Sequence, residues 1–154
     1  MDPQLIIGEP LPVEDPLAEW RWKIGGSPRV VLLSRSGDAF LIQPGGEIDW
    51  LDTGGGRLER IAQSRAEFDR VLEQPAEAAR LLLSPVVEQS IQRDGPFPAG
   101  VCLGFTQLPI IGGTYTLNNR WRVSAVEHFG VTGDLHRQMR DLPGGAEVRI
   151  RVVD

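Results

Sequence analysis

Four short apolar segments separated by glycine-rich turns constrain the fold of this chain most strongly. Each segment has the length of a β-strand, and each break between them contains glycine. Strand length and turn chemistry agree in such a pattern, which is typical of an antiparallel meander. The sequence therefore predicts a four-stranded sheet from Val30–Leu33, Ala39–Gln43, Glu47–Asp52 and Arg57–Ala62.

Helical signals follow the meander. Ser64 and Glu67 form a capping box, Ser-x-x-Glu, in which each side chain bonds to a free backbone N–H at the start of a helix. A second helix is predicted to begin at Pro75, since proline is well tolerated at the first helical position. Ser84-Pro85 is expected to kink that helix or to split it in two.

The second half of the chain predicts further strands and one long helix. A capping box at Ser124 and Glu127 opens a helix that runs to about Leu142. Gly130 and Gly133 each cost this helix about 1 kcal/mol relative to Ala, so we expect both to permit close packing. Two strands are predicted at Val101–Phe105 and Glu147–Val153. The predicted fold class is α+β, an antiparallel sheet of the N-terminal meander plus later strands, packed with about three to four helices.

The first sixteen residues have a different composition from the rest. Residues 1–16 hold four prolines and four acidic residues, which predicts an extended arm. Asp15-Pro16 then opens a short helix through Trp22. Trp20 and Trp22 are two residues apart and are not expected to share a helical face, but at least one should anchor the arm. Residues 17–154 are expected to form a single domain.

Charge and apolar content exclude several classes of partner. The formal net charge is −5, which argues against direct nucleic-acid binding because that requires a basic surface. The N-terminus lacks the pattern of a signal peptide, and no apolar run is long enough to span a bilayer. We therefore expect a cytoplasmic protein without a membrane partner, while its oligomeric state stays open.

Catalytic and metal-binding patterns are weak. His128 and His136 lie eight residues apart on one predicted helix, so they are separated by about 12 Å along its axis and by about 80° around it. They are not expected to share a metal ion. Cys102, the single cysteine, is either a buried inert thiol or a nucleophile that needs a histidine partner. No phosphate-binding or nucleophile-elbow motif occurs, so neither a cofactor nor a metal is expected.

Two blocks of residues stand out along the chain. The first block comprises Gly37-Asp38-Ala39-Phe40, Trp50 to Gly54 with Asp52, and Leu58 to Ala62 with Glu67-Phe68. The second comprises Leu108, Pro109, Gly112, Gly113, Tyr115, His128, His136 and Asp141 to Gly144 with Pro143. In this order, and over about residues 20–150, the blocks resemble the C-terminal domain of immunity proteins that neutralise DNase toxins delivered by bacterial type VI secretion.

This resemblance implies a non-catalytic protein that binds a nuclease effector, and the negative charge is compatible with a basic partner. The interface candidates are the hairpin residues Asp38, Glu47, Asp49, Asp52 and, as an aromatic anchor, Trp50. Trp50 could instead pack in the core.

Two other functions are compatible with the sequence. Family members often carry an additional N-terminal domain that the arm does not resemble, so the chain could be a standalone interaction or regulatory module of the same fold. The other is a hydrolase that uses His128, Asp134 or His136, and it requires these groups to converge in one pocket.

Overall fold

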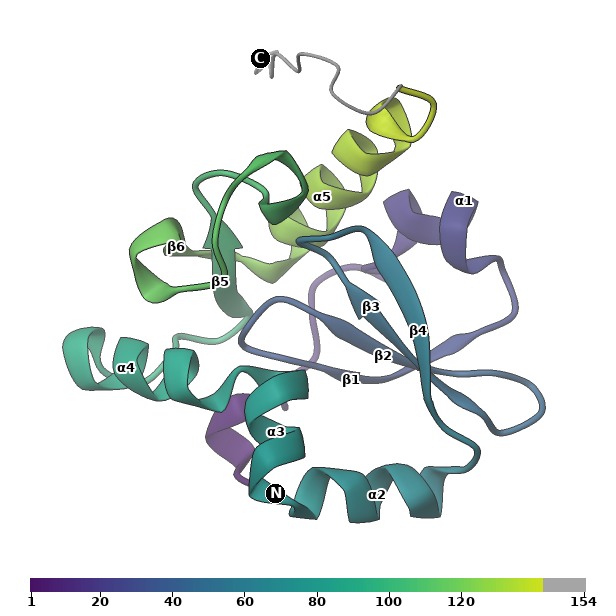
Figure 1. Ribbon diagram of the computed structural model, residues 1–154, viewed down its shortest axis with the longest axis horizontal. Helices are drawn as coiled ribbons and strands as arrows, with labels where there is room; N and C mark the ends of the chain where they lie inside the picture. Colours follow the sequence, from purple (N-terminus) through teal and green to yellow (C-terminus); the bar gives the residue numbers. More distant parts are fainter. Residues whose placement is uncertain (143–154) are drawn as a thin grey trace.

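The meander forms as the sequence predicts. In the computed structural model, which describes residues 1–142, one antiparallel sheet has the order β1-β2-β3-β4 (Figure 1). Its strands are β1 (Arg29–Leu33), β2 (Ala39–Ile42), β3 (Ile48–Asp52) and β4 (Arg57–Ala62). Each of the three connecting turns contains a glycine with positive φ, a conformation that residues with a Cβ rarely adopt. Pro143 and the predicted strand Glu147–Val153 lie outside the described residues.

Three helices follow the sheet in the chain. They are α2 (Arg65–Glu73), α3 (Pro75–Leu82) and α4 (Ser84–Asp94). The Glu67 backbone N–H donates to Ser64 Oγ over 3.1 Å, which confirms this capping residue. The predicted interruption near Ser84-Pro85 is a full break, because Leu83 adopts a left-handed conformation with φ of 48°.

A second, two-stranded sheet precedes the last helix. β5 (Val101–Phe105) pairs in antiparallel fashion with β6 (Arg120–Ser124), and α5 (Ala125–Met139) follows directly. Two short 3₁₀ turns, η3 (Pro109–Ile111) and η4 (Leu117–Asn119), lie between the strands. β6 was not predicted, and α5 ends at Met139, earlier than expected. The α+β class is confirmed, and no helix within residues 1–142 is long and apolar enough to cross a bilayer.

Helices cover both faces of the four-stranded sheet. Alternate side chains of each strand point to opposite faces, so each strand can contribute to the apolar cluster on either side. On β2, Phe40 joins one apolar cluster, whereas Ala39 and Leu41 join the other. Helices α2, α3 and α4 pack on the Phe40 side, and α5 packs on the other side together with α1 (Arg21–Ile24) (Figure 1).

The N-terminal segment is attached to the sheet. Leu5 is buried, Ile6 forms a bridge with Ser34, and the Ile7 backbone N–H donates to the Leu33 carbonyl over 2.9 Å. Glu9 pairs with Arg35 over 2.9 Å. Within residues 1–16, only Pro3–Leu5 forms a helical turn, the 3₁₀ helix η1.

The two N-terminal tryptophans lie closer together than the sequence suggested. Their rings stack with centroids 6.0 Å apart, because the backbone changes from a 3₁₀ turn, η2 (Ala18–Trp20), to the α-helix α1 between them. Both indoles reach α5: Trp20 Nε1 donates to Thr132 Oγ1 over 3.3 Å, and Trp22 Nε1 donates to the Gly133 carbonyl over 3.2 Å.

Only one of the two α5 glycines serves close packing. A Cβ on Gly133 would lie 2.6 Å from the Glu19 carbonyl oxygen, whereas a Cβ on Gly130 would meet nothing within 4 Å. The expectation for Gly130 is therefore wrong.

Candidate functional site

Two buried histidines of α5 hold two turns of the large sheet. His128 Nε2 lies 2.8 Å from the Gly37 carbonyl oxygen, and His136 Nε2 lies 2.8 Å from that of Thr53. A carbonyl oxygen can only accept, so each Nε2 carries the proton. Burial lowers the pKa of His128 to about 4 and lowers that of His136 as well. Both rings are neutral near pH 7 and act as structural donors.

Asp38, at the first of these turns, is buried with 4% of its surface exposed. Its carboxylate accepts from Trp50 Nε1 over 3.0 Å and from the Thr53 backbone N–H over 3.0 Å. Burial, with the charge of Asp52 as the second cause, raises the pKa of Asp38 to about 7. The buried Asp38 carboxylate therefore stabilises this turn through hydrogen bonds to Trp50 and Thr53.

Asp52 ties the turn after β3 to the loop that contains Tyr115. The Tyr115 hydroxyl donates to Asp52 Oδ2 over 2.9 Å, and the Gly54 backbone N–H donates to Oδ1 over 3.1 Å. Burial and the Asp52 carboxylate raise the pKa of Tyr115. A Cβ on Gly54 would lie 2.9 to 3.0 Å from Phe105, Pro109 and Tyr115. Asp52, Gly54 and Tyr115, taken from both sequence blocks, thus form one contact.

The five interface candidates occupy different environments. Asp38, Asp49 and Asp52 are buried, unlike most acidic side chains. Asp49 accepts from Gln43 and Arg60 over 2.8 and 3.0 Å. Glu47 and Trp50 are partly exposed, and the Trp50 ring packs against the core and beneath the Arg80 guanidinium. Of the five, these two remain the accessible ones.

The loop around η3 is tightly folded. Leu108 is buried, and Gly112 has a φ of 102°. A Cβ on Gly113 would overlap the Gln107 carbonyl oxygen. The same Gln107 carbonyl accepts from Asn119 Nδ2 over 2.8 Å. These contacts fix the position of Leu108 below the second sheet.

Arg120 of β6 connects the second sheet to the turn at Gly37, and nothing in the sequence marked it. Its Nε donates to the Gly104 carbonyl over 3.1 Å, and its Nη2 donates to the carbonyls of Leu103 and Ser36. The guanidinium lies 3.9 Å from the centroid of the Phe105 ring. A single arginine in an unassigned segment gives no sequence signal, since its partners are distant in the chain.

An apolar groove runs between the second sheet and α5, with a volume of about 290 Å³. Trp121 of β6 and Val131 of α5 stand on its two sides, with 53% and 57% of their surfaces exposed. Glu127 adds an acidic group to its lining. The other apolar lining residues are Phe105, Leu108, Val123 and Leu135. A concave apolar site flanked by two exposed large apolar side chains favours the binding of a partner or ligand. We call it the Trp121 groove.

The groups required by the hydrolase hypothesis do not converge. His128 lines the Trp121 groove, whereas His136 lines a separate cavity. The Asp134 carboxylate is bonded to its own helix neighbours Arg137 and Gln138. Cys102 is fully buried and burial raises its pKa to about 12, which fits the inert reading of this thiol. Groups of three or more metal-ligating side chains are absent from residues 1–142.

One known protein family matches part of this chain. Residues 62–136 match the family model described as "T6SS immunity protein Tdi1, C-terminal". No curated protein matches the chain. The matched segment runs from the end of β4 into α5 and includes every residue that lines the Trp121 groove. The family that the two sequence blocks predicted is thus confirmed over residues 62–136, where the chain matches the C-terminal domain of type VI secretion immunity proteins.

Proposed function

We propose that this protein is an immunity protein that binds a nuclease effector of type VI secretion in the cytoplasm and neutralises it without catalysing a reaction. The observation that carries the proposal is the Trp121 groove, an exposed apolar surface within the segment that matches the immunity family. Trp121 is a large side chain held on a two-stranded sheet, and rigid aromatic side chains are frequent anchors of protein interfaces.

Charge supports a basic partner. The chain carries a net charge of −5, and Glu127 lines the groove itself. A nuclease must hold a polyanion and therefore presents positive charge, which raises its rate of association with an acidic surface. Glu47 and Trp50, the accessible pair among the hairpin candidates, are proposed as a secondary contact. If the groove alone forms the interface, the protein would inhibit the effector either by covering its active site or by blocking its assembly.

The test requires a nuclease effector of type VI secretion, and the first to examine is any such effector encoded beside the gene for this protein. Calorimetry should show a 1:1 complex of nanomolar affinity, and added protein should stop DNA cleavage stoichiometrically. Trp121→Ala should raise the dissociation constant about 30-fold or more, as expected of an interface anchor. Val13→Ala, which truncates an exposed apolar residue outside the groove, is the matched control and should bind normally. Normal binding by Trp121→Ala would remove the groove from the interface. Failure of the unsubstituted chain to bind at micromolar concentration would favour the standalone module.

A further inference from the structure

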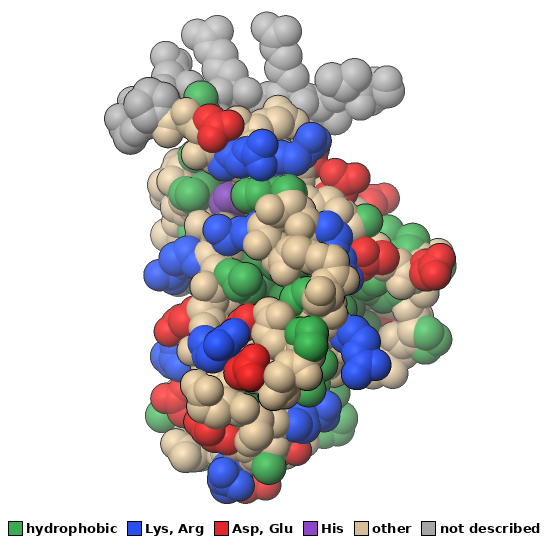
Figure 2. All heavy atoms as spheres, turned by 90° about the vertical axis from the view of Figure 1, so that its right-hand side faces the viewer, with side chains coloured by type: hydrophobic (Ala, Val, Ile, Leu, Met, Phe, Trp, Pro, Cys, Tyr) green, Lys and Arg blue, Asp and Glu red, His purple; other side chains and the backbone are tan. Residues whose placement is uncertain are grey.

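A second cavity lies on the other side of η3 from the Trp121 groove. Leu108, just before η3, lines the groove, whereas Ile110, within η3, lines this cavity. The cavity has a volume of about 330 Å³, and it opens between α1 and the end of α5. Figure 2 views this side of the molecule and shows a histidine side chain among hydrophobic ones, below a band of Lys and Arg side chains.

The cavity gathers positive charge on one aromatic ring. Lys23 Nζ lies 5.8 Å from the centroid of the Trp22 ring, and Arg140 Cζ lies 5.5 Å from the same centroid. Both cations lie within 6 Å of one ring, so an anion bound beside that ring would be attracted by each of them. All three side chains line the cavity.

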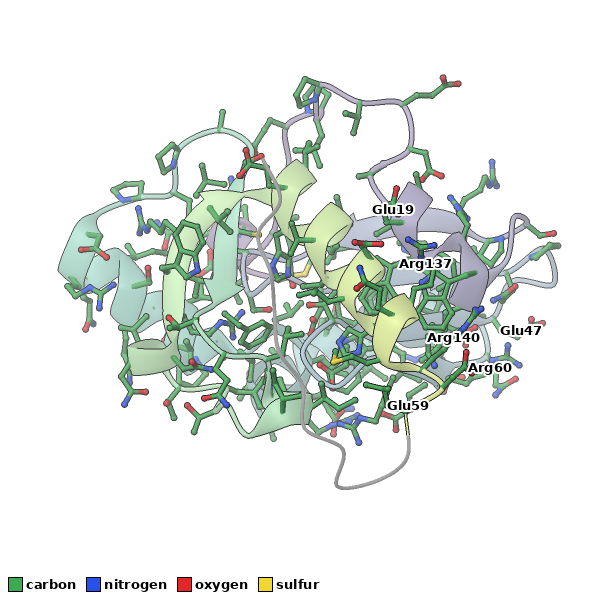
Figure 3. The ribbon with its side chains drawn as sticks, turned by 90° about the horizontal axis from the view of Figure 1, so that it is seen from above. Glu19, Glu47, Glu59, Arg60, Arg137 and Arg140 are labelled. Atoms are coloured by element: carbon green, nitrogen blue, oxygen red, sulfur yellow. The ribbon has the colours of Figure 1, made fainter. Side chains whose placement is uncertain are left out.

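Among residues 1–142, no acidic side chain lines this cavity. Lys23 has no ion-pair partner among residues 1–142, and Arg140 pairs only with the highly exposed Asp141 over 3.5 Å, which stabilises little in water. Figure 3 shows Arg140 extending from the end of α5, with Arg60 and Glu59 of β4 beyond it. Arg60 is already paired with Asp49 over 3.0 Å. Both charged side chains that line the cavity within residues 1–142 are therefore positive, although the whole chain is acidic.

The remaining walls are apolar or neutral. Ile110, Met139 and Leu142 line the cavity, and Ile110 and Leu142 are exposed by 52% and 47%. His136 lies at its inner side, and its Nε2–H is committed to the Thr53 carbonyl. The ring therefore adds a flat neutral surface and an acceptor at Nδ1. Two cations above an apolar wall suit a ligand that has one anionic end and one apolar end.

We propose that the cavity formed by Trp22, Lys23, Ile110, Met139 and Arg140 is a binding site for a carboxylate carried on an apolar body. Lys23 and Arg140 hold the carboxylate, and the indole of Trp22 with Ile110 of η3 contacts the apolar part. A free small organic acid supplies this chemistry, and so does an acidic side chain beside an apolar one on a protein partner.

Benzoate is the probe, with benzyl alcohol as the neutral molecule of similar shape. The chain has four tryptophans, whose indole N–H signals can be followed by NMR and assigned with Trp22→Phe. Benzoate should shift the Trp22 signal saturably with a dissociation constant on the order of 1 mM. The signals of Trp50 and Trp121 should stay unchanged. Lys23→Gln and Arg140→Gln should each weaken binding about 3- to 10-fold. Arg29→Gln, which removes an exposed charge outside the cavity, should leave it unaltered.

Two results would overturn the proposal: no saturable Trp22 shift at about 20 mM benzoate, or benzyl alcohol binding as tightly as benzoate. A second experiment, which measures binding of the effector, distinguishes a carboxylate on the protein partner from a free organic acid. Only this second experiment rests on the proposed immunity function. Weaker effector binding by Lys23→Gln assigns the carboxylate to the partner. Unchanged effector binding, with benzoate binding lost, assigns the site to a free acid.

Discussion

His128 Nε2 and the carbonyl oxygen of Gly37 lie 2.8 Å apart, although 91 positions separate the two residues in the chain. This bond joins α5 to the first turn of the large sheet. Both partners are buried, so the family-matched half of the chain and the N-terminal meander are parts of one packed unit. Because His128 lies so close to its backbone, Gly37 is sensitive to substitution.

Gly37→Ala should destabilise the fold by about 2–4 kcal/mol. A Cβ there would lie 2.6 Å from His128 Nε2 and 2.7 Å from the Leu103 carbonyl oxygen, and Gly37 has a φ of 97°. Gly46→Ala is the matched control, since Gly46 has a φ of 98° but nothing within 4 Å of the added Cβ. It should lose only about 1 kcal/mol. Urea unfolding measures both values, and equal losses would show that backbone strain alone is responsible.

Asp38 and His128 should drive the pH dependence of stability in opposite directions. Burial raises the pKa of Asp38 from 3.8 to about 7, so the folded protein binds more protons than the unfolded chain between these values. Stability from this group is present at low pH and falls as pH rises. Burial lowers the pKa of His128 from 6.5 to about 4, so its contribution is present above pH 6.5 and is lost as pH falls toward 4.

Single substitutions should expose each contribution. His128→Gln should leave a protein whose free energy of unfolding falls as pH rises from 4.5 to 7, with a limiting slope of about 1.4 kcal/mol per pH unit. Asp38→Asn should leave one whose free energy of unfolding rises over the same range, and His136, whose pKa burial also lowers, acts in that direction. Urea unfolding at several pH values checks both slopes. Parallel curves for the two variants would contradict the assignment.

Tyr115→Phe should cost about 1–2 kcal/mol of stability. The substitution removes the hydroxyl that donates to Asp52 over 2.9 Å, and it keeps the ring that packs against Phe105. Asp52 would retain its bonds from the Gly54 and Gly55 N–H groups and from Arg57. Thermal unfolding against the unsubstituted protein gives the value. A loss below about 0.3 kcal/mol would mean that water replaces the hydroxyl without penalty.

Local signals in the sequence predicted most of the elements. The strands of the meander and both capping serines, Ser64 and Ser124, follow from residues within a few positions of each other. β6 was missed, because Arg120-Trp121-Arg122 has no apolar run that would mark a strand. With β6 unassigned, Trp121 could not be placed beside Val131, and the groove remained hidden.

Neighbouring residues in the sequence also do not predict that these acidic side chains are buried. Asp38 and Asp52 lie on hairpins, where acidic side chains are usually solvated, but Asp52 is covered by a tyrosine that lies 63 positions away. A carboxylate is buried only when distant donors reach it, and the sequence of a hairpin does not reveal those donors. The two histidines line separate cavities, and their common role at the sheet turns depends on contacts 83 and 91 positions apart.

The two glycines of α5 should respond oppositely to alanine. Gly133→Ala should destabilise the protein by about 1–3 kcal/mol, because the added Cβ would lie 2.6 Å from the carbonyl oxygen of Glu19, a backbone atom of η2. Gly130→Ala should stabilise it by about 0.5–1 kcal/mol, since alanine favours a helix interior and nothing lies within 4 Å of the new atom. Unfolding in urea measures both, with each variant serving as the control for the other. If Gly130→Ala were destabilising, α5 would have to pack against something at that position. If Gly133→Ala were neutral, η2 would have to move away from α5, and the bond from Trp22 Nε1 to the Gly133 carbonyl would be weakened with it.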